Sequence, residues 1–360
     1  MNAAVAVLLA VMNLPAPAAD ANDPVRVGLK WLAAQQKVDG SWDTLNNYPT
    51  AINATAGLAL LMQGSTAKDG TYASHIRKAV AWFEANASDD GMLGGRTESE
   101  RYQPHYSHAQ ALLFVACAYD VDDDGDRRAR LAKLLEKATA LLIGRQSPGG
   151  GWGLGDRRDP GGFDRTDTTA IVLQALLAVR KAGVAVPTKV IAQGFQFLTR
   201  ATNTANGKLV YATSGGVAPR GEEGLWTLSA DAAATAFMHD GARPLVQSKW
   251  VTCASTHTPA QLQMLNQFRR HGSSVLSAQY EVARCAYSLG DNGHRKLDPD
   301  ARPENLLRWS SYRDKLFPLL KAAQLDDGSW PDNNLGSAYI TALTLIILQL
   351  KNGYLPAFAR

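Results

Sequence analysis

The stretch QQKVDGSWDTLNNYPTAINATAGLALLMQG, residues 35–64, places a glutamine, a glycine and a tryptophan ahead of a long apolar run. The pattern Q-x-x-x-G-x-W occurs there at residues 36–42, again as QSPGGGW at 146–152, and again as QLDDGSW at 324–330. The glycines of the three copies recur at spacings that divide into steps of about 55 to 59 residues. The pattern therefore predicts a repeat protein.

Weaker copies occupy the remaining steps. WFEANASDDGMLGG supplies Gly91, and FLTRATNTANGKLVYA supplies Gly207. A fifth copy, within roughly residues 245–273, has lost both the glycine and the tryptophan, and VQSKWVTCASTHTPAQLQMLNQF is the expected first helix of that repeat. Six units of about 55 residues suit helical hairpins with extra loop.

Each unit contains two different apolar segments. The first is amphipathic, as in VRVGLKWLAAQQ at residues 25–36. The second is apolar almost all round, as in AINATAGLALLM, HAQALLFVACAY, TTAIVLQALLAV, LSADAAATAFM, SAQYEVARCAY and SAYITALTLIIL. A helix that is apolar on every side must be buried on every side. The sequence therefore predicts an all-α protein: an α/α toroid of six hairpins, with the second helices as an inner ring, in a single domain over residues 22–360.

The repeated glycine, tryptophan and glutamine have a structural explanation. Glycine lets the chain leave a helix through a left-handed conformation that strains other residues. The tryptophan covers the turn, and the glutamine amide bonds free backbone groups at a helix end. We expect the motif to join repeats and to take no part in catalysis.

Composition excludes several classes of protein. With 46% hydrophobic residues the chain of 360 residues is globular, and a formal charge of +4 over 37 basic and 33 acidic residues gives no support for nucleic-acid binding. Residues 1–21 combine an apolar stretch with small residues near Ala18, which favours a cleaved export signal and a periplasmic or extracellular location, although a hydrophobic first helix is the alternative. No segment is long enough to predict a transmembrane span.

The three cysteines, Cys117, Cys253 and Cys285, show no CxxC pair and no histidine at metal spacing. No zinc site is therefore predicted. Cys117 and Cys285 belong to inner helices two and five, which are three steps apart in a ring of six. Even adjacent packed helices stand about 8 to 10 Å apart, farther than a disulfide spans, so we expect these thiols to stay unpaired.

The Q-x-x-x-G-x-W copies after outer helices resemble the QW repeats of squalene-hopene and oxidosqualene cyclases, and the series of hairpins is similar to the related protein prenyltransferase β subunits. The resemblance covers about residues 24–352. It implies the same toroid and an isoprenoid or lipid-like ligand. The zinc ligands of the prenyltransferases and the Cys-Gly-Glu-Gln element of complement-type thioester domains are absent.

In the cyclases, an acidic motif at the start of an inner helix protonates the substrate. RTDTTA at residues 165–170 lies at such a start and aligns Asp167 with the acid, but Arg165 and Thr168 replace the flanking carboxylates. Crowded carboxylates make a strong acid, and a neighbouring arginine opposes this. Asp167 is thus either a helix N-cap or a proton donor.

Two functions remain open. One is a binding or scaffold protein that takes an isoprenoid, lipid, sugar or protein partner at the mouth of the barrel. The alternative is a terpene cyclase or prenyltransferase-type enzyme with Asp167 as general acid. Polar residues near the starts of inner helices would line this mouth, or would simply cap the helices: His105, Tyr106, His108, Asp164, Trp226, Asp231 and Tyr339.

The segment DVDDDGDRR, residues 120–128, offers a possible calcium site. Asp120, Asp122, Asp124 and Asp126 occupy positions one, three, five and seven of a calcium-binding loop. Position twelve is Leu131, where the loop needs a bidentate carboxylate. A solvated acidic loop between helices is the alternative.

Overall fold

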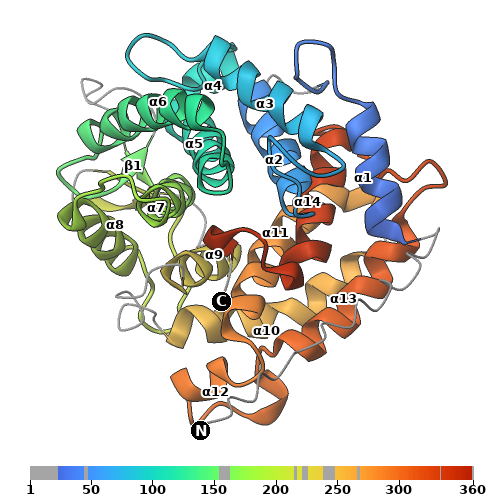
Figure 1. The fold of residues 1–360 in the computed structure, drawn as a ribbon. Coiled ribbons are helices and arrows are strands. Elements are labelled where there is room, and N and C mark those ends of the chain that lie inside the picture. Colours follow the sequence, from blue (N-terminus) through green and yellow to red (C-terminus); the bar gives the residue numbers. More distant parts are fainter. Residues whose placement is uncertain are drawn as a thin grey trace, which may run out of the picture.

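The computed structural model describes residues 23–43, 48–153, 163–214, 217–220, 226–237, 248–265, 268–332 and 334–358. Six helices form an inner ring: α2 (Pro49–Leu61), α5 (Pro104–Asp120), α7 (Thr166–Lys181), α9 (Trp226–Phe237), α11 (Phe268–Leu289) and α14 (Ser337–Gln349). Each contacts the next, and α14 contacts α2, so the ring is closed. Figure 1 shows this ring of helices enclosed by a second one.

The outer ring consists of α1 (Pro24–Ala34), α3 (Ala73–Asn86), α6 (Gly125–Gly144), α8 (Thr188–Arg200), α10 (Ser248–Met264) and α13 (Trp309–Ala323). Each outer helix packs on the inner helix that precedes it in the ring: α3 on α2, α6 on α5, and finally α1 on α14. The all-α toroid predicted from the sequence is confirmed. α10 also lies where the fifth outer helix was expected.

Burial separates the two rings as the apolar patterns predicted. In α2 every residue from Thr50 to Leu61 is buried. In α6 the buried side chains Leu131, Leu135, Ala138 and Leu142 follow the spacing of one helix face. The outer helix α6 therefore contributes one face to the core, whereas the inner helix α2 is buried on every side.

The repeated motif has the structural role that the sequence indicated. In the third repeat Trp152 Nε1 donates to the carbonyl of Leu142 at 2.8 Å, and Gln146 Nε2 donates to the carbonyls of Gly150 and Val190, both at 2.9 Å. Val190 belongs to the next outer helix, so the glutamine joins two repeats. Gln324 does the same between the sixth repeat and the first, donating to Pro24 O at 2.9 Å.

Glycine is required in this turn for two reasons. Gly150 has a φ of +87°, and a Cβ atom there would lie 2.5 Å from the carbonyl oxygen of Gln193 on α8. In the fifth repeat only residues 265–267 separate α10 from α11, and no motif is needed in so short a connection. This explains why that copy has lost its glycine and tryptophan.

Smaller elements complete the fold. Strands β1 (Trp152–Gly153), β2 (Asp164–Arg165), β3 (Ala212–Ser214) and β4 (Val217–Arg220) form an antiparallel sheet in that order, and β2 leads directly into α7. The short helices are α4 (Glu98–Tyr102), α12 (Gly293–Leu297), η3 (Pro303–Asn305), η4 (Leu350–Asn352) and η5 (Pro356–Phe358).

The three cysteines are free and buried. Burial raises the pKa of the Cys285 thiol to about 12. Cys117 on α5 and Cys285 on α11 belong to helices that are not neighbours in the ring, as the repeat pattern predicted.

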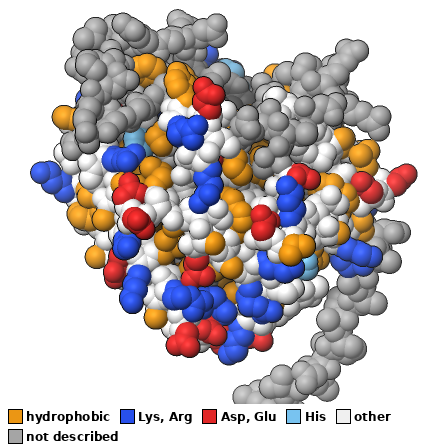
Figure 2. Space-filling model, turned by 90° about the horizontal axis from the view of Figure 1, so that it is seen from above, with side chains coloured by type: hydrophobic (Ala, Val, Ile, Leu, Met, Phe, Trp, Pro, Cys, Tyr) orange, Lys and Arg blue, Asp and Glu red, His pale blue; other side chains and the backbone are white. Residues whose placement is uncertain are grey.

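Charge and hydropathy agree with the composition. Among the described residues, no helix is both long enough and apolar enough to cross a membrane. Figure 2 shows basic and acidic side chains intermingled over one face of the molecule. The expected export signal, residues 1–21, lies outside the described residues.

Candidate functional site

A cavity of about 200 Å³ lies inside the inner ring, and all six inner helices contribute to its wall. Its polar lining consists of Thr55, Tyr106, Gln110, Asp167, Asp231, Ser277, Tyr280, Glu281 and Tyr339. Its apolar lining consists of Leu58, Leu113, Ile171, Ala278, Leu343 and Ile346. Concave, mostly apolar cavities with a few convergent polar groups are the usual form of ligand sites.

Two carboxyl groups of this cavity are hydrogen-bonded to each other. Asp231 lies on α9, and Glu281 faces it from the neighbouring helix α11. Arg284, one turn after Glu281, donates from Nη1 to Glu281 Oε2 at 2.7 Å and lies 3.5 Å from Asp231 Oδ1. One guanidinium thus serves two carboxyl groups, and two carboxyl groups bound to each other share a proton.

The environment favours the protonated form of Glu281. Burial raises its pKa, and the negative charge of Asp231 raises it further, well above the usual range, while Arg284 opposes both. Burial also raises the pKa of Asp231, but Arg284 and the hydrogen bond from Glu281 stabilise its charged form. The shared proton therefore resides on Glu281.

Asp167 has the opposite environment. It lies in the first turn of α7, and Arg165, the last residue of β2, donates from Nε to Asp167 Oδ1 at 2.9 Å and from Nη2 to Oδ2. Arg165 is itself held over the ring of Tyr211, with 4.6 Å between its Cζ atom and the ring centroid. A forked ion pair of this kind stabilises a charged carboxylate. Three carboxyl groups therefore line the cavity: Glu281 and Asp231, which are bonded to each other, and Asp167, which is held in an ion pair by Arg165.

Three tyrosines complete the polar wall. Burial raises the pKa of Tyr339 to about 12, and it raises that of Tyr106 well above the ordinary value. Tyr339 also hydrogen-bonds Gln110 and Ser277. Their hydroxyl groups therefore stay protonated in the physiological range, where they can donate hydrogen bonds to a polar ligand while the rings contact its apolar faces.

Four residues expected at the mouth or as an acid line this cavity: Tyr106, Asp167, Asp231 and Tyr339. Asp167 is not the N-cap of its helix, because that position is occupied by Arg165. Both of its carboxylate oxygens are also engaged by Arg165 in a forked ion pair. The carboxyl group suited to act as an acid is Glu281.

Other expected residues serve the scaffold. His108 is fully buried, accepts from Leu93 N at 3.0 Å through Nδ1, and lies 3.0 Å from Ala138 O through Nε2. Burial lowers its pKa to about 4. His108 thus replaces the threonine that holds the turn in the third repeat, where Trp152 N donates to Thr169 Oγ1.

His105 and Asp164 are not part of the cavity lining. His105 Nδ1 is 2.9 Å from Gly153 O on β1, and Asp164 accepts a hydrogen bond from Ser147 in the turn that follows α6. Trp226 is the first residue of α9, and its side chain lies outside the described part of the structure.

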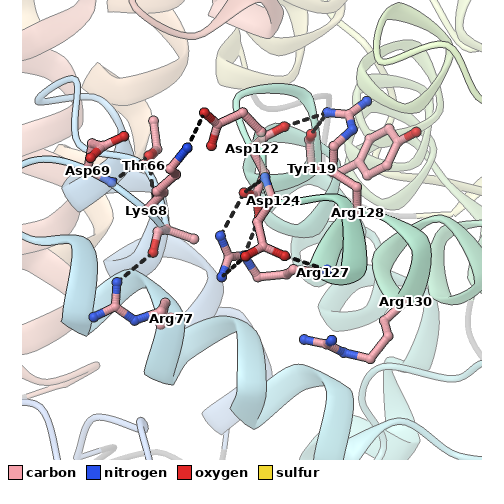
Figure 3. Close-up of polar contacts among 12 residues, drawn as sticks. Thr66, Lys68, Asp69, Arg77, Tyr119, Asp122, Asp124, Arg127, Arg128 and Arg130 are labelled. Carbon is pink, nitrogen blue, oxygen red and sulfur yellow. Dashed lines mark hydrogen bonds and ion pairs between the residues drawn. The ribbon is translucent and has the colours of Figure 1, made fainter.

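The acidic loop at residues 120–128 has a geometry that opposes the calcium expectation. Figure 3 shows the side chains of Arg127 and Arg128 directed at the loop, and Arg128 bonds the backbone carbonyls of Tyr119 and Asp122. Arg127 Nη2 donates to Asp122 Oδ1 at 2.7 Å, and Asp124 caps α6 by accepting from Arg127 N at 2.9 Å. Within the described residues, no group of three or more His, Cys, Asp or Glu could hold a metal ion. Arginine charge therefore compensates these carboxylates.

Sequence reasoning missed Glu281, Arg284, Tyr280, Gln110 and Ser277. Glu281 and Arg284 were visible in SAQYEVARCAY as two charged residues within a segment that had to be buried. Charged residues are almost never fully buried unless they are paired. That exception to the apolar pattern was the available signal.

The structure is similar to solved α/α-toroid enzymes that act on carbohydrates. A family 76 glycoside hydrolase from a bovine Bacteroides thetaiotaomicron strain has a TM-score of 0.61 and 10% identity, covering 92% of this chain and 78% of its own. The GH76A α-1,6-mannanase of Salegentibacter sp. has a TM-score of 0.57 and 10% identity, covering 91% and 99%. Cellobiose 2-epimerase from Bacillus thermoamylovorans has a TM-score of 0.58 and 10% identity, covering 92% and 99%.

No protein-family model matches the sequence, and neither does any of the curated proteins compared with it. The expected resemblance to squalene cyclases and prenyltransferases is wrong, because the similar structures are glycoside hydrolases and an epimerase. The prediction of an isoprenoid or lipid ligand falls with it, as does that of a terpene cyclase. The physical reason is that the Gln, Gly and Trp motif closes a helical turn, and such a turn reports architecture and not chemistry.

Proposed function

We propose that this protein is a glycoside hydrolase whose active site is the cavity of the inner ring. The observation that supports this most directly is that two carboxyl groups with different partners line one cavity: Glu281 is bonded to Asp231 and Arg284, whereas Asp167 forms a forked ion pair with Arg165. Glycosidases use two carboxyl groups in different roles. Groups whose environments push their protonation states apart are the natural assignments for acid and base.

Each residue then has a defined task. Glu281 gives its proton to the glycosidic oxygen as the bond between that oxygen and the anomeric carbon breaks. Asp167 lines the same cavity from α7, which is separated from α11 by α9 in the ring. It either takes the proton of an attacking water or attacks the anomeric carbon itself. Asp231 and Arg284 orient Glu281 through the contacts described above.

The lining of the cavity is compatible with a sugar. Tyrosine rings and leucine side chains contact the C–H faces of a pyranose, and Gln110, Ser277 and the tyrosine hydroxyls bond its hydroxyl groups. The similarity to family 76 hydrolases supports this choice of substrate class. Among those proteins, an inactive variant of the mannanase with two neighbouring aspartates replaced was solved with α-1,6-mannotriose.

We also propose that the enzyme acts outside the cytoplasm. The apolar stretch and small residues of segment 1–21 support export. N-terminal sequencing of the protein recovered from a periplasmic or culture fraction tests this, and a mature chain that retains residues 1–21 would contradict it.

The function is tested with a panel of α- and β-linked oligosaccharides that begins with α-1,6-mannotriose. We expect new reducing ends with the wild type and none with Glu281→Gln or Asp167→Asn, and the anomer released first, read by NMR, distinguishes the two roles of Asp167. A wild type that binds glycans without hydrolysing any of them would show a lectin-like protein and refute the enzyme.

A further inference from the structure

The chain continues after α14 into a segment that crosses the inner ring. We call residues 350–358 the strap. Its first part, η4, contacts α11 and α14, and its last part, η5, contacts α5 and α7 on the other side of the ring. Figure 1 shows this red segment lying across the middle of the toroid. The strap therefore joins opposite walls of the barrel.

The strap turns apolar side chains inward. Leu355, Ala357 and Phe358 are buried, whereas Tyr354 is 57% exposed. The ring of Phe358 has its centroid 5.9 Å from Arg284 Cζ, and the ring of Tyr280 lies 5.3 Å from the same atom. The guanidinium of Arg284 is thus covered by two aromatic rings.

Arg284 is the residue that connects the strap to the acid pair. Its side chain is only 4% exposed, and it bonds Glu281 at 2.7 Å and lies 3.5 Å from Asp231. A guanidinium in this position has no water to compete with its carboxyl partners, and electrostatic interactions strengthen as water is excluded. The cover over Arg284 therefore also affects the two carboxyl groups.

We propose that the strap is a positioning element of the active site: by keeping water from Arg284, it holds the guanidinium on Glu281 and Asp231 and sets the pH at which this pair loses its shared proton. The catalytic meaning of the strap rests on the proposed function, but the proton equilibrium does not. Phe358 is the positioning residue, since it acts on the acid only through Arg284.

Other ionisable groups surround the acid pair. The groups that face the acid pair or act on it electrostatically come from every inner helix except α2, together with β2: Tyr106 on α5, Arg165 and Asp167 at the start of α7, Asp231 on α9, Tyr280 and Arg284 on α11, and Tyr339 on α14. The strap covers only Arg284 among them in the contacts described.

The direction of the effect follows from the cause of the shift. Burial and the negative charge of Asp231 raise the pKa of Glu281, and the attraction of Arg284 for the charged form opposes them. Opening the cover admits water to the guanidinium and weakens this attraction, so the pKa of Glu281 rises and the proton is lost at higher pH. If Glu281 is the acid, the alkaline limb of the pH–rate profile moves to higher pH as well.

The test reads the proton directly. Infrared difference titration of the whole protein follows the carbonyl stretch of a protonated carboxylic acid, and Glu281→Gln assigns the band by removing it. In Phe358→Ala we expect the band to disappear roughly one pH unit higher than in the wild type, within the range that one nearby opposite charge can produce. Phe358→Leu keeps the cover and should titrate with the wild type, as should Tyr354→Ala on the exposed side of the strap.

Two results would overturn the proposal: an unshifted band in a folded Phe358→Ala protein, or an equal shift in Tyr354→Ala. If Phe358→Ala does not fold, Phe358→Val keeps more of the apolar side chain and should shift the band by a smaller amount in the same direction. A shifted band in a protein that hydrolyses no glycan would support the strap and refute only the proposed enzyme.

Discussion

The turn that follows α6 and the part of α11 that lines the cavity differ in how visible they are in the sequence and in what their residues do. The turn carries the most conspicuous pattern in the sequence, and its residues are fully used in holding two repeats together: Trp152 bonds Leu142, and Gln146 bonds Gly150 and Val190. The wall of α11 carries no recognisable motif. It nevertheless supplies Glu281 and Arg284, the acid and its guanidinium partner.

The difference shows which structural features leave a motif in the sequence. The Gln, Gly and Trp pattern is local, because a single turn requires all three residues within seven positions. An acid pair is assembled from α9 and α11 by the closing of the ring, so its members need no fixed spacing along the chain. A repeated motif in this fold therefore predicts architecture, and a charged residue on a buried helix predicts a site.

The largest expected effect separates these regions by function. Glu281→Gln keeps the shape of the side chain but removes the proton that the leaving group needs, so we expect kcat to fall by about 10²- to 10⁴-fold. The unfolding midpoint should stay near that of the wild type. Glu136→Gln, at an exposed position on α6, is the matched control and should retain full activity. Hydrolysis by Glu281→Gln at the wild-type rate would show that another residue is the general acid.

The second effect tests the turn. Trp152 is fully buried, and Trp152→Ala removes a large side chain together with a hydrogen bond. We expect the free energy of unfolding to fall by about 3–5 kcal/mol, measured by urea denaturation. Val38→Ala, in the equivalent turn of the first repeat, changes a residue that is 94% exposed and should cost almost nothing. Equal losses in the two variants would contradict the structural role of the tryptophan.

The fold could be predicted from the sequence because its evidence is periodic. Six similar segments, each apolar all round, must form a buried layer, and repeated glycines near 55-residue steps give the number of hairpins. The site could be predicted only in part. Tyr106, Asp167, Asp231 and Tyr339 lie near the starts of inner helices, where convergence at one mouth was expected.

Glu281 and Arg284 could not be placed in the same way. They lie in the middle of α11, and their importance depends on Asp231 from another helix and on Phe358 from the strap. The acidic run at residues 120–128 shows the complementary case. Its carboxylates are close in sequence, but Arg127, only a few positions later, bonds the carboxylate of Asp122, and Arg128 bonds the backbone carbonyl of the same residue.

The third effect sharpens the account of the turn. Gly150→Ala adds a Cβ atom 2.5 Å from the Gln193 carbonyl at a residue with φ of +87°. Gly183 has a similar φ of +90° with nothing within 4 Å of the added atom, so Gly183→Ala measures the backbone strain alone. We expect a loss of about 1 kcal/mol for Gly183→Ala and about 2–4 kcal/mol for Gly150→Ala, by thermal or urea unfolding. Equal losses would show that contact with α8 is unimportant.

The smallest effect concerns the coupling within the acid pair. Asp231→Asn removes a negative charge that raises the pKa of Glu281, and it leaves Arg284 to attract the charged form. The pKa of Glu281 should therefore fall, by about one unit, which corresponds to about 1.4 kcal/mol. The alkaline limb of the pH–rate profile should move to lower pH by the same amount.

Stability gives a second measurement of this coupling that needs no substrate. A carboxyl group whose pKa is raised in the folded state binds more protons there than in the unfolded chain. The folded protein therefore loses stability as the pH rises from the ordinary pKa of this group to its pKa in the folded state. In Asp231→Asn this loss should be smaller than in the wild type. Asp122→Asn is the control, because its carboxylate is paired with Arg127 on the other ring of helices and should leave the alkaline limb unmoved. If the alkaline limb of the pH–rate profile moves in Asp122→Asn and not in Asp231→Asn, the titrating acid is not Glu281.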